Sequence, residues 1–280
     1  MTRRRRTPWL ALLPLYLAAQ GAGAPGVAAT AAAAGAAVQG TAHLDWGLRL
    51  IREVTPAANA YASRPTVVTW AGVDGATESR NRSVCSSLVA HLLMQAQGYR
   101  KADFKRWMGT TFPQAQDFHD AIAAGHGFTR IDAVSRIRPG DIVAIKYPPG
   151  SHPTGHVLVV VEPPAARPPT PPEAPGTVQY ELRILDSSRT GHGLTDTRHY
   201  AKGKFHAGVG QGLLRLYVTP AGRIAAYSWS VTKASQIYSM TDRDLVVGRL
   251  DGTILPGTAK DVPAAATAED EPEGDLEPPG

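Results

Sequence analysis

Residues 83–98 decide the fold of this chain, and they read Ser-Val-Cys-Ser-Ser-Leu-Val-Ala-His-Leu-Leu-Met-Gln-Ala-Gln-Gly. Apolar side chains recur in this stretch at helical spacing, which predicts an amphipathic α-helix. Ser83 is a good N-cap residue, and Gly98 is a good helix stop. Cys85 lies in the first turn, on one face with Leu88, Val89, Leu92 and Ala96. We therefore expect Cys85 to point toward the element on which the helix packs.

The amino terminus has the three parts of a secretory signal peptide. Arg3–Arg6 form a basic region, residues 9–19 form an apolar stretch, and Val27-Ala28-Ala29 offers a cleavage site. The apolar stretch is shorter than the roughly 20 residues that span a bilayer. We therefore expect residues 1–29 to be a signal peptide and the product to be exported, periplasmic or secreted, with no stable membrane anchor.

Cys85 is the only cysteine in the chain, so it cannot form an intramolecular disulfide. In an oxidising compartment a lone thiol is exposed to oxidation. The start of a helix stabilises a thiolate through the macrodipole and the free N–H groups. Cys85 is therefore a candidate nucleophile, and a small buried apolar residue is the alternative interpretation.

One domain is flanked by two segments of biased composition. Residues 30–42 are rich in Ala and Gly and predict a flexible leader. Residues 257–280 are rich in Pro, Ala and acidic residues and predict a disordered tail. Residues 43–256 are long enough for one domain with a substantial core. Helical patterns fill its first half and strand patterns its second half, which predicts an α+β fold.

Further helices are expected at residues 44–54, 101–108 and 113–124. Strands are expected at residues 67–70, 141–147, 156–161, 178–186, 212–218, 223–230 and 245–250. The run at 156–161 is apolar on both faces, which predicts a central strand. Residues 163–176 hold seven prolines and predict an inserted surface loop.

Two polar residues fall inside these strand patterns. His156 opens the strand at 156–161, and Asp186 ends the strand at 178–186 in phase with its apolar residues. A buried polar side chain costs free energy unless it has a partner. An imidazole oriented by a carboxylate would give each of them a partner. A core histidine and an Asx turn at the strand end are the alternatives.

Together these motifs resemble the NlpC-type family of papain-like cysteine peptidases, which cut bacterial cell-wall peptides. The shared segments are Val84-Cys85-Ser86-Ser87, Arg138-Pro139-Gly140-Asp141-Ile142-Val143, Gly155-His156-Val157 and Leu185-Asp186-Ser187-Ser188. The family usually has Asp before its cysteine and Gly two places after it, where this chain has Val84 and Ser87.

The resemblance implies a papain-like core, in which a central nucleophile helix packs on an antiparallel sheet. It also implies Cys85 as the nucleophile, His156 as the base and Asp186 as the orienting residue. His199, followed by His192, is the alternative third residue. The implied activity is that of a cysteine peptidase or amidase, which hydrolyses amide bonds through an acyl-enzyme.

The charge balance favours an anionic polymer as the partner. Four of the 29 basic residues lie in Arg3–Arg6, and seven of the 24 acidic residues follow Lys260, so residues 30–260 carry a formal charge of +8. A basic body suits cell-wall polymer, and peptidoglycan is the expected substrate. Nucleic acid is not expected, because no basic stripe is interleaved with aromatic residues and no zinc-finger spacing occurs.

No cofactor and no metal are expected, because the nine histidines show no compact ligand spacing. Two other functions remain open at this point. One is a non-catalytic protein that binds the cell wall and keeps the fold. The other is a cysteine acyltransferase or amidase that acts on a different small substrate.

Overall fold

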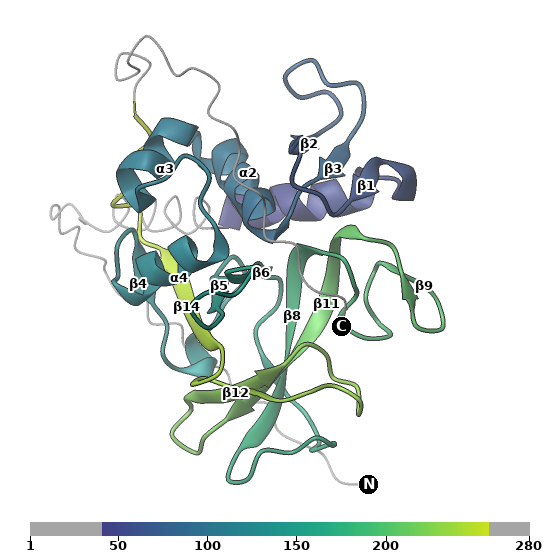
Figure 1. Cartoon of the computed structure of the whole chain (residues 1–280), viewed down its shortest axis with the longest axis vertical. Helices are drawn as coiled ribbons and strands as arrows, with labels where there is room; N and C mark the ends of the chain where they lie inside the picture. The colour runs from purple at the N-terminus through teal and green to yellow at the C-terminus, as the bar shows by residue number, and fades with distance from the viewer. Residues whose placement is uncertain (1–40, 258–280) are drawn as a thin grey trace, which may run out of the picture.

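The computed structural model of the chain describes residues 41–257. Helices dominate the first part of this range and a largely antiparallel sheet the second, which confirms the α+β prediction (Figure 1). The expected signal peptide at 1–29 lies outside the described residues, as do nearly all of the expected leader and tail. Residues 41 and 42, assigned above to the leader, are already helical. Among the described residues, no helix has the length and apolar character needed to cross a membrane.

The main sheet has nine strands, and all of its neighbouring strands pair antiparallel. Across the sheet the strands are β13 (Tyr238–Ser239), β12 (Ile224–Ser228), β11 (Gly208–Val218), β8 (Val178–Ser188), β6 (Gly155–Val160), β5 (Ile142–Lys146), β14 (Asp244–Leu250) and β4 (Phe128–Arg130). The ninth strand, β7 (Ala165–Ala166), pairs with β8 and lies inside the proline-rich segment. The sequence predicts a surface loop for the whole segment, whereas the structure places this short strand within it. All residues of β6 are buried, as expected for a central strand.

Two smaller pairings flank this sheet. The first is a three-stranded sheet made of β1 (Asn59–Ala60), β3 (Arg80–Arg82) and β2 (Val67–Thr69). The second is a hairpin made of β9 (His199–Ala201) and β10 (Lys204–Phe205). Single turns of 3-10 helix occur at η1 (Pro56–Ala58) and η2 (Val134–Arg136).

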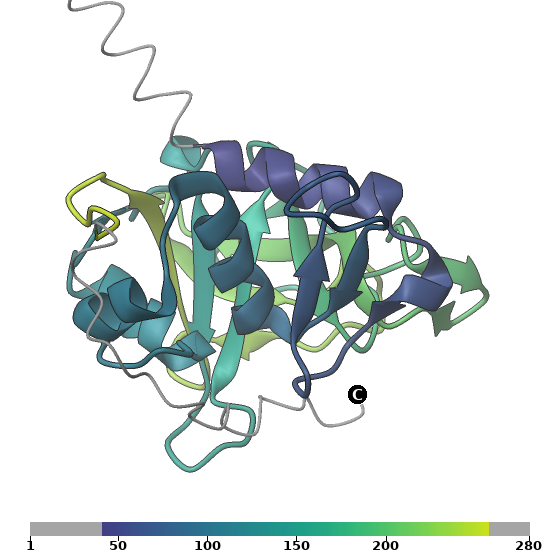
Figure 2. The same cartoon turned by 90° about the horizontal axis from the view of Figure 1, so that it is seen from above.

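The helices are a first helix over residues 41–53, α2 (Cys85–Gln97), α3 (Lys101–Met108) and α4 (Ala115–Ala123). The first helix and α2 lie side by side in both overall views (Figures 1 and 2). α2 contacts β6 and β8, whereas α4 contacts β4, β5, β6 and β14. The helix around Cys85 therefore packs on the middle of the sheet.

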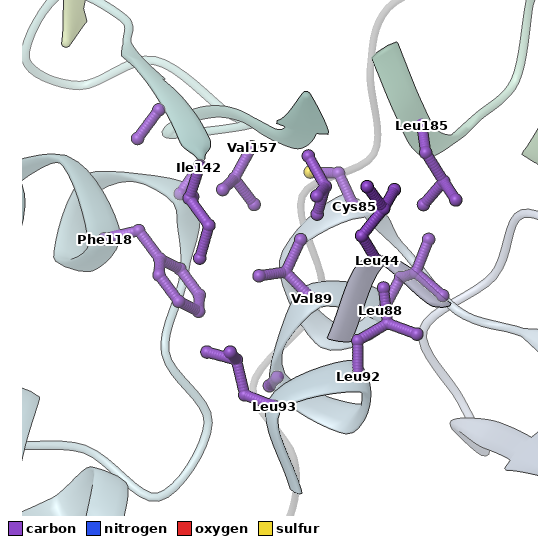
Figure 3. Packing of buried hydrophobic residues seen from close by; sticks show 14 of the residues in the cluster. Leu44, Cys85, Leu88, Val89, Leu92, Leu93, Phe118, Ile142, Val157 and Leu185 are labelled. Carbon is purple, nitrogen blue, oxygen red and sulfur yellow. The ribbon is translucent and has the colours of Figure 1, made fainter. Parts of the chain in front are cut away.

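Strand alternation divides the core into two clusters, one on each side of the sheet. On the α2 side, the buried residues of β5, β6 and β8 are Ile142, Ala144, Val157, Val159 and Leu185. Figure 3 shows Ile142, Val157 and Leu185 around the helix. On the other side, the buried residues of the same strands are Val143, Ile145, Leu158, Val160, Leu182 and Ile184. A residue's parity along β6 or β8 therefore decides which cluster it joins.

The start of α2 differs from the prediction by one residue, because Val84 and not Ser83 is the N-cap. The Ser83 hydroxyl donates a hydrogen bond to Asn81 Oδ1 at 2.6 Å, so it does not cap the helix. Val84 has no side-chain oxygen, and its own N–H donates to Ser87 Oγ at 3.1 Å. The end of α2 is as predicted, since Gly98 adopts the left-handed conformation at φ 74°.

The turn before β5 joins the first helix to the sheet. The Nε2 of His43 donates a hydrogen bond to the Gly140 carbonyl at 2.8 Å. Burial lowers the pKa of His43 to about 4, against the opposing effect of this hydrogen bond, so the ring is neutral near pH 7. Asp141 in the same turn is fully buried, and it accepts from the Arg138 N–H at 2.8 Å and from Arg249 Nε at 2.8 Å.

Replacement of Arg249 by leucine should destabilise the protein by about 3 kcal/mol, because the Asp141 carboxylate would stay buried without its cation. Arg130→Leu is the matched control, since its ion pair with Asp132 is largely exposed. The control should cost no more than about 1 kcal/mol. Urea unfolding at pH 7 measures both values. Equal losses in the two variants would contradict the role given to the Asp141 ion pair.

Candidate active site

The site lies where β6 and β8 stop pairing. These two strands pair only at Val159 with Leu185 and at Val160 with Ile184. His156 lies at the opening end of β6, and β8 continues past Leu185 paired only with β11. By strand alternation, His156 and Asp186 both face away from α2. The His156 and Trp229 rings accordingly meet in a T-shaped arrangement on the far side of the sheet, with their centroids 5.2 Å apart.

The structure brings His156 and Asp186 together, as the sequence predicts. His156 Nε2 lies 2.7 Å from Asp186 Oδ2, and neither side chain is exposed to solvent. An ionised carboxylate only accepts hydrogen bonds, so Nε2 must carry the proton. In the neutral ring Nδ1 is then the basic nitrogen.

His192 binds the same carboxylate oxygen. Its Nε2 lies 2.8 Å from Asp186 Oδ2, and its Nδ1 lies 2.9 Å from the Trp229 carbonyl oxygen. Both neighbours are acceptors, so His192 bridges the Asp186 carboxylate and the Trp229 carbonyl. The sequence suggested His192 as a substitute for Asp186, whereas the structure makes the two residues partners.

Arg198 is a partner that sequence reasoning missed. Its side chain is almost fully buried, and Nη2 forms an ion pair with Asp186 Oδ1 at 2.9 Å. The same guanidinium donates to both carboxylate oxygens of Asp196, from Nε at 2.9 Å and from Nη2 at 2.8 Å. Asp196 also accepts from the backbone N–H of His192 at 2.8 Å. Two opposite charges in a loop ordinarily indicate a solvated surface, so only the fold reveals this network.

These partners keep Asp186 ionised despite its burial. Desolvation alone would raise the pKa of Asp186. The positive charges of Arg198 and His192, with the hydrogen bonds from His156 and His192, outweigh desolvation and hold that pKa well below its usual value. Asp186 is thus a permanent anion near neutral pH.

The same three donors resemble a metal site, but the charges around them argue otherwise. His156, Asp186 and His192 offer ligand atoms that all lie within 4.8 Å of one another. A metal ligand must be a deprotonated ring nitrogen, whereas both histidines present an N–H to Asp186 here. The guanidinium of Arg198 at 2.9 Å from the second carboxylate oxygen also repels a cation. The donor set therefore fits a hydrogen-bonded charge network better than a divalent metal.

Cys85 lies on the other side of the sheet from this network. It is fully buried in the apolar cluster between α2 and the sheet, close to Val157 and Leu185 (Figure 3). Within residues 41–257, Sγ makes no hydrogen bond. A hydrogen bond connects the start of α2 with the end of β8, however, because Ser187 Oγ donates to the Ser83 carbonyl at 2.8 Å. The structure thus joins two of the three expected residues and keeps the thiol apart.

His199, the first alternative to Asp186, does not join the site. Its ring packs against Phe205 in the β9–β10 hairpin, with centroids 5.2 Å apart. Of the two alternative histidines, His192 is the one that reaches the Asp186 carboxylate.

Asp186→Asn should destabilise the protein by about 3–5 kcal/mol at pH 7, because it removes the anion from a buried charge network. The pKa of Asp186 is lower in the folded state than in the unfolded state, so its stabilising contribution is complete above about pH 4 and is lost below that. The difference between wild type and variant should therefore shrink by about 1.4 kcal/mol per pH unit below pH 4. Urea unfolding at pH 7, 5 and 3 tests this, with the exposed Asp45→Asn as control. A difference independent of pH would show that Asp186 is not the ionised centre.

No family model matches the chain, and no solved structure matches it. The resemblance to NlpC-type peptidases thus stays a prediction. The chain is 32% identical over 219 residues to "Uncharacterized protein R653" of Acanthamoeba polyphaga mimivirus. This similarity covers 75% of the chain and 96% of the viral protein. The chain therefore belongs to the same protein family as this mimivirus protein.

Proposed function

We propose that this protein is a cysteine hydrolase that cleaves amide bonds through an acyl-enzyme, with a papain-like division of roles. The observation that carries the proposal is the buried hydrogen bond from His156 Nε2 to Asp186 Oδ2 at 2.7 Å. An anion at this position fixes the tautomer of the histidine and leaves Nδ1 as the basic atom. It also stabilises the imidazolium that forms when His156 takes a proton from the nucleophile.

The start of α2 supports Cys85 as the nucleophile. Cys85 is the first residue of the helix, and its N-cap, Val84, supplies no capping oxygen. Within the described part of the chain, the backbone N–H of Cys85 makes no hydrogen bond. A free N–H at the positive end of a helix stabilises a thiolate and the oxyanion of a tetrahedral intermediate. One such oxyanion donor is worth about 2.7–4 kcal/mol in other enzymes.

The proposal requires the thiol to reach His156 Nδ1 during the reaction. His156 lies in the stretch where β6 and β8 are not paired. Cys85 lies beside Val157 and Leu185, the chain neighbours of His156 and Asp186 (Figure 3). Catalytic hydrogen bonds are often long in a protein without substrate and tighten when it binds. Rotation of Cys85 toward this gap is the movement that the mechanism needs.

The substrate class rests on sequence features. The basic body of the chain and the resemblance to NlpC-type peptidases favour peptidoglycan peptides, reached after export to the periplasm or the medium. A cysteine acyltransferase or amidase with another small substrate uses the same groups. The full burial of Cys85 favours a further candidate, a non-catalytic cell-wall-binding protein that keeps the fold.

Purified protein should release new amino groups from peptidoglycan, and His156→Ala should lower the rate at least a hundredfold, because the general base is lost. Cys85→Ala should abolish release. His126→Ala is the matched control, since His126 is exposed and lies away from the site. Amino groups are counted by a colorimetric assay under identical conditions.

Alkylation of Cys85 by iodoacetamide at pH 6.5 separates the rival functions. If the protein is a cysteine hydrolase, Cys85 in the wild type should be alkylated at least tenfold faster than in His156→Ala. The His126→Ala variant should be alkylated at the wild-type rate. Equal rates in all three, together with no release of amino groups, would refute the hydrolase and favour the non-catalytic protein. Cleavage of a small amide with peptidoglycan left intact would favour the other substrate class.

A further inference from the structure

A cavity lies beside α2, on the helix face turned away from Cys85. It encloses ≈ 50 Å³ and lies between α2, the first turn of α3 and the loop before α4. Its lining includes neither Cys85, His156 nor Asp186. The function of this cavity is therefore a question separate from the chemistry of the thiol.

The inner wall of the cavity is apolar. Ala90 and Met94 of α2, Phe104 of α3, and Phe112 with Pro113 from the following loop line it. Phe104 and Ala90 belong to the buried core, so this wall is held in place by the fold. Such a surface favours an apolar group in a ligand, at roughly 25 cal/mol per Å² removed from water.

One end of the cavity presents hydrogen-bond donors. Ser86 and Ser87 line it, and their backbone N–H groups make no hydrogen bond within residues 41–257. Ser86 as a whole residue is only 4% exposed and lines the same cavity, and its hydroxyl makes no hydrogen bond among those residues. Among the described residues, the Ser86 hydroxyl oxygen is not one of the fully buried side-chain atoms that lack a partner, so it is accessible and can donate to an acceptor in the cavity. Free N–H groups at the start of a 13-residue helix favour that acceptor being an anion.

The charge at the rim has the matching sign. Lys101 lines the cavity, and its Nζ lies 4.1 Å from the centre of the Phe112 ring. No aspartate or glutamate is among the lining residues. The cavity thus combines a lysine, hydrogen-bond donors and an apolar lining. This combination favours a ligand with an anionic head group and a short apolar chain.

We propose that this cavity binds a small carboxylic acid with a short, unbranched apolar chain. The carboxylate accepts hydrogen bonds from the N–H groups of Ser86 and Ser87 and from the Ser86 hydroxyl. The ammonium group of Lys101 balances its charge at the rim. The chain lies against Met94, Phe104 and Phe112. This site does not depend on the proposed hydrolase, because Cys85 lies on the opposite face of α2.

Three probes of equal chain length test the head group: hexanoate, hexylamine and hexan-1-ol. Each is titrated into the full-length protein while backbone amide signals are followed by two-dimensional ¹H–¹⁵N NMR. Hexanoate should shift the Ser86 and Ser87 amides in a saturable way, and hexylamine should leave them unchanged. Hexan-1-ol should bind more weakly than hexanoate. The proposal would be overturned if hexylamine bound as tightly as hexanoate. It would also be overturned if hexanoate left the Ser86 and Ser87 amide signals unshifted.

Variants locate the binding. Lys101→Met should weaken hexanoate binding about threefold, with a smaller effect at high salt. Lys105→Met is the matched control, because Lys105 is exposed on the same helix and outside the cavity. Ala90→Leu should fill the cavity and abolish binding, and its melting temperature reports whether it folds. If it does not fold, Ser86→Ala takes its place and should weaken binding. Cys85→Ala should bind as the wild type does, so a failed hydrolase leaves this result intact.

Discussion

The buried carboxylate of Asp186 is the constraint on which the rest of the site depends. An anion in the protein interior is stable only when charges and hydrogen bonds replace its lost water. Here His156 from β6, with His192 and Arg198 from the segment after β8, supply them. Asp196 in turn fixes the guanidinium, and the Trp229 carbonyl fixes the second imidazole. The carboxylate thus ties β6 and the segment after β8 to the end of β8, and it fixes Nε2 as the ring nitrogen through which His156 donates.

Much of this fold could be predicted from the sequence, because hydrophobic periodicity reports burial directly. The apolar run of β6, the alternation along β8 and the helical spacing after Cys85 each lie where the structure has them. Prediction failed where a side chain had a competing partner. Ser83 is a good N-cap by type, but its hydroxyl binds Asn81, and the helix begins one residue later. Gln179 alternates with the apolar residues of β8, a pattern that ordinarily indicates an exposed side chain, but it is buried because its amide binds the backbone of the proline-rich segment.

The site was predictable only in part, and for a related reason. His156 and Asp186 stand out because each is polar inside an apolar pattern, and a shared partner is the simplest way to satisfy both. Asp196 and Arg198 carry no such signal, since a charged pair in a loop looks solvated until the fold buries it. The parity of β6 and β8 has the further consequence that His156 and Asp186 face away from α2. Sequence order alone does not reveal that the thiol packs on the opposite side of the sheet.

The protonation of His156 tests the account most directly, because every role given to the site follows from it. Long-range ¹H–¹⁵N correlation NMR of the folded protein at pH 7 distinguishes the two neutral tautomers and the imidazolium of a histidine. We predict a neutral His156 with its proton on Nε2 and a deprotonated Nδ1. A His156 ring with its proton on Nδ1, or one protonated on both nitrogens at that pH, would contradict it.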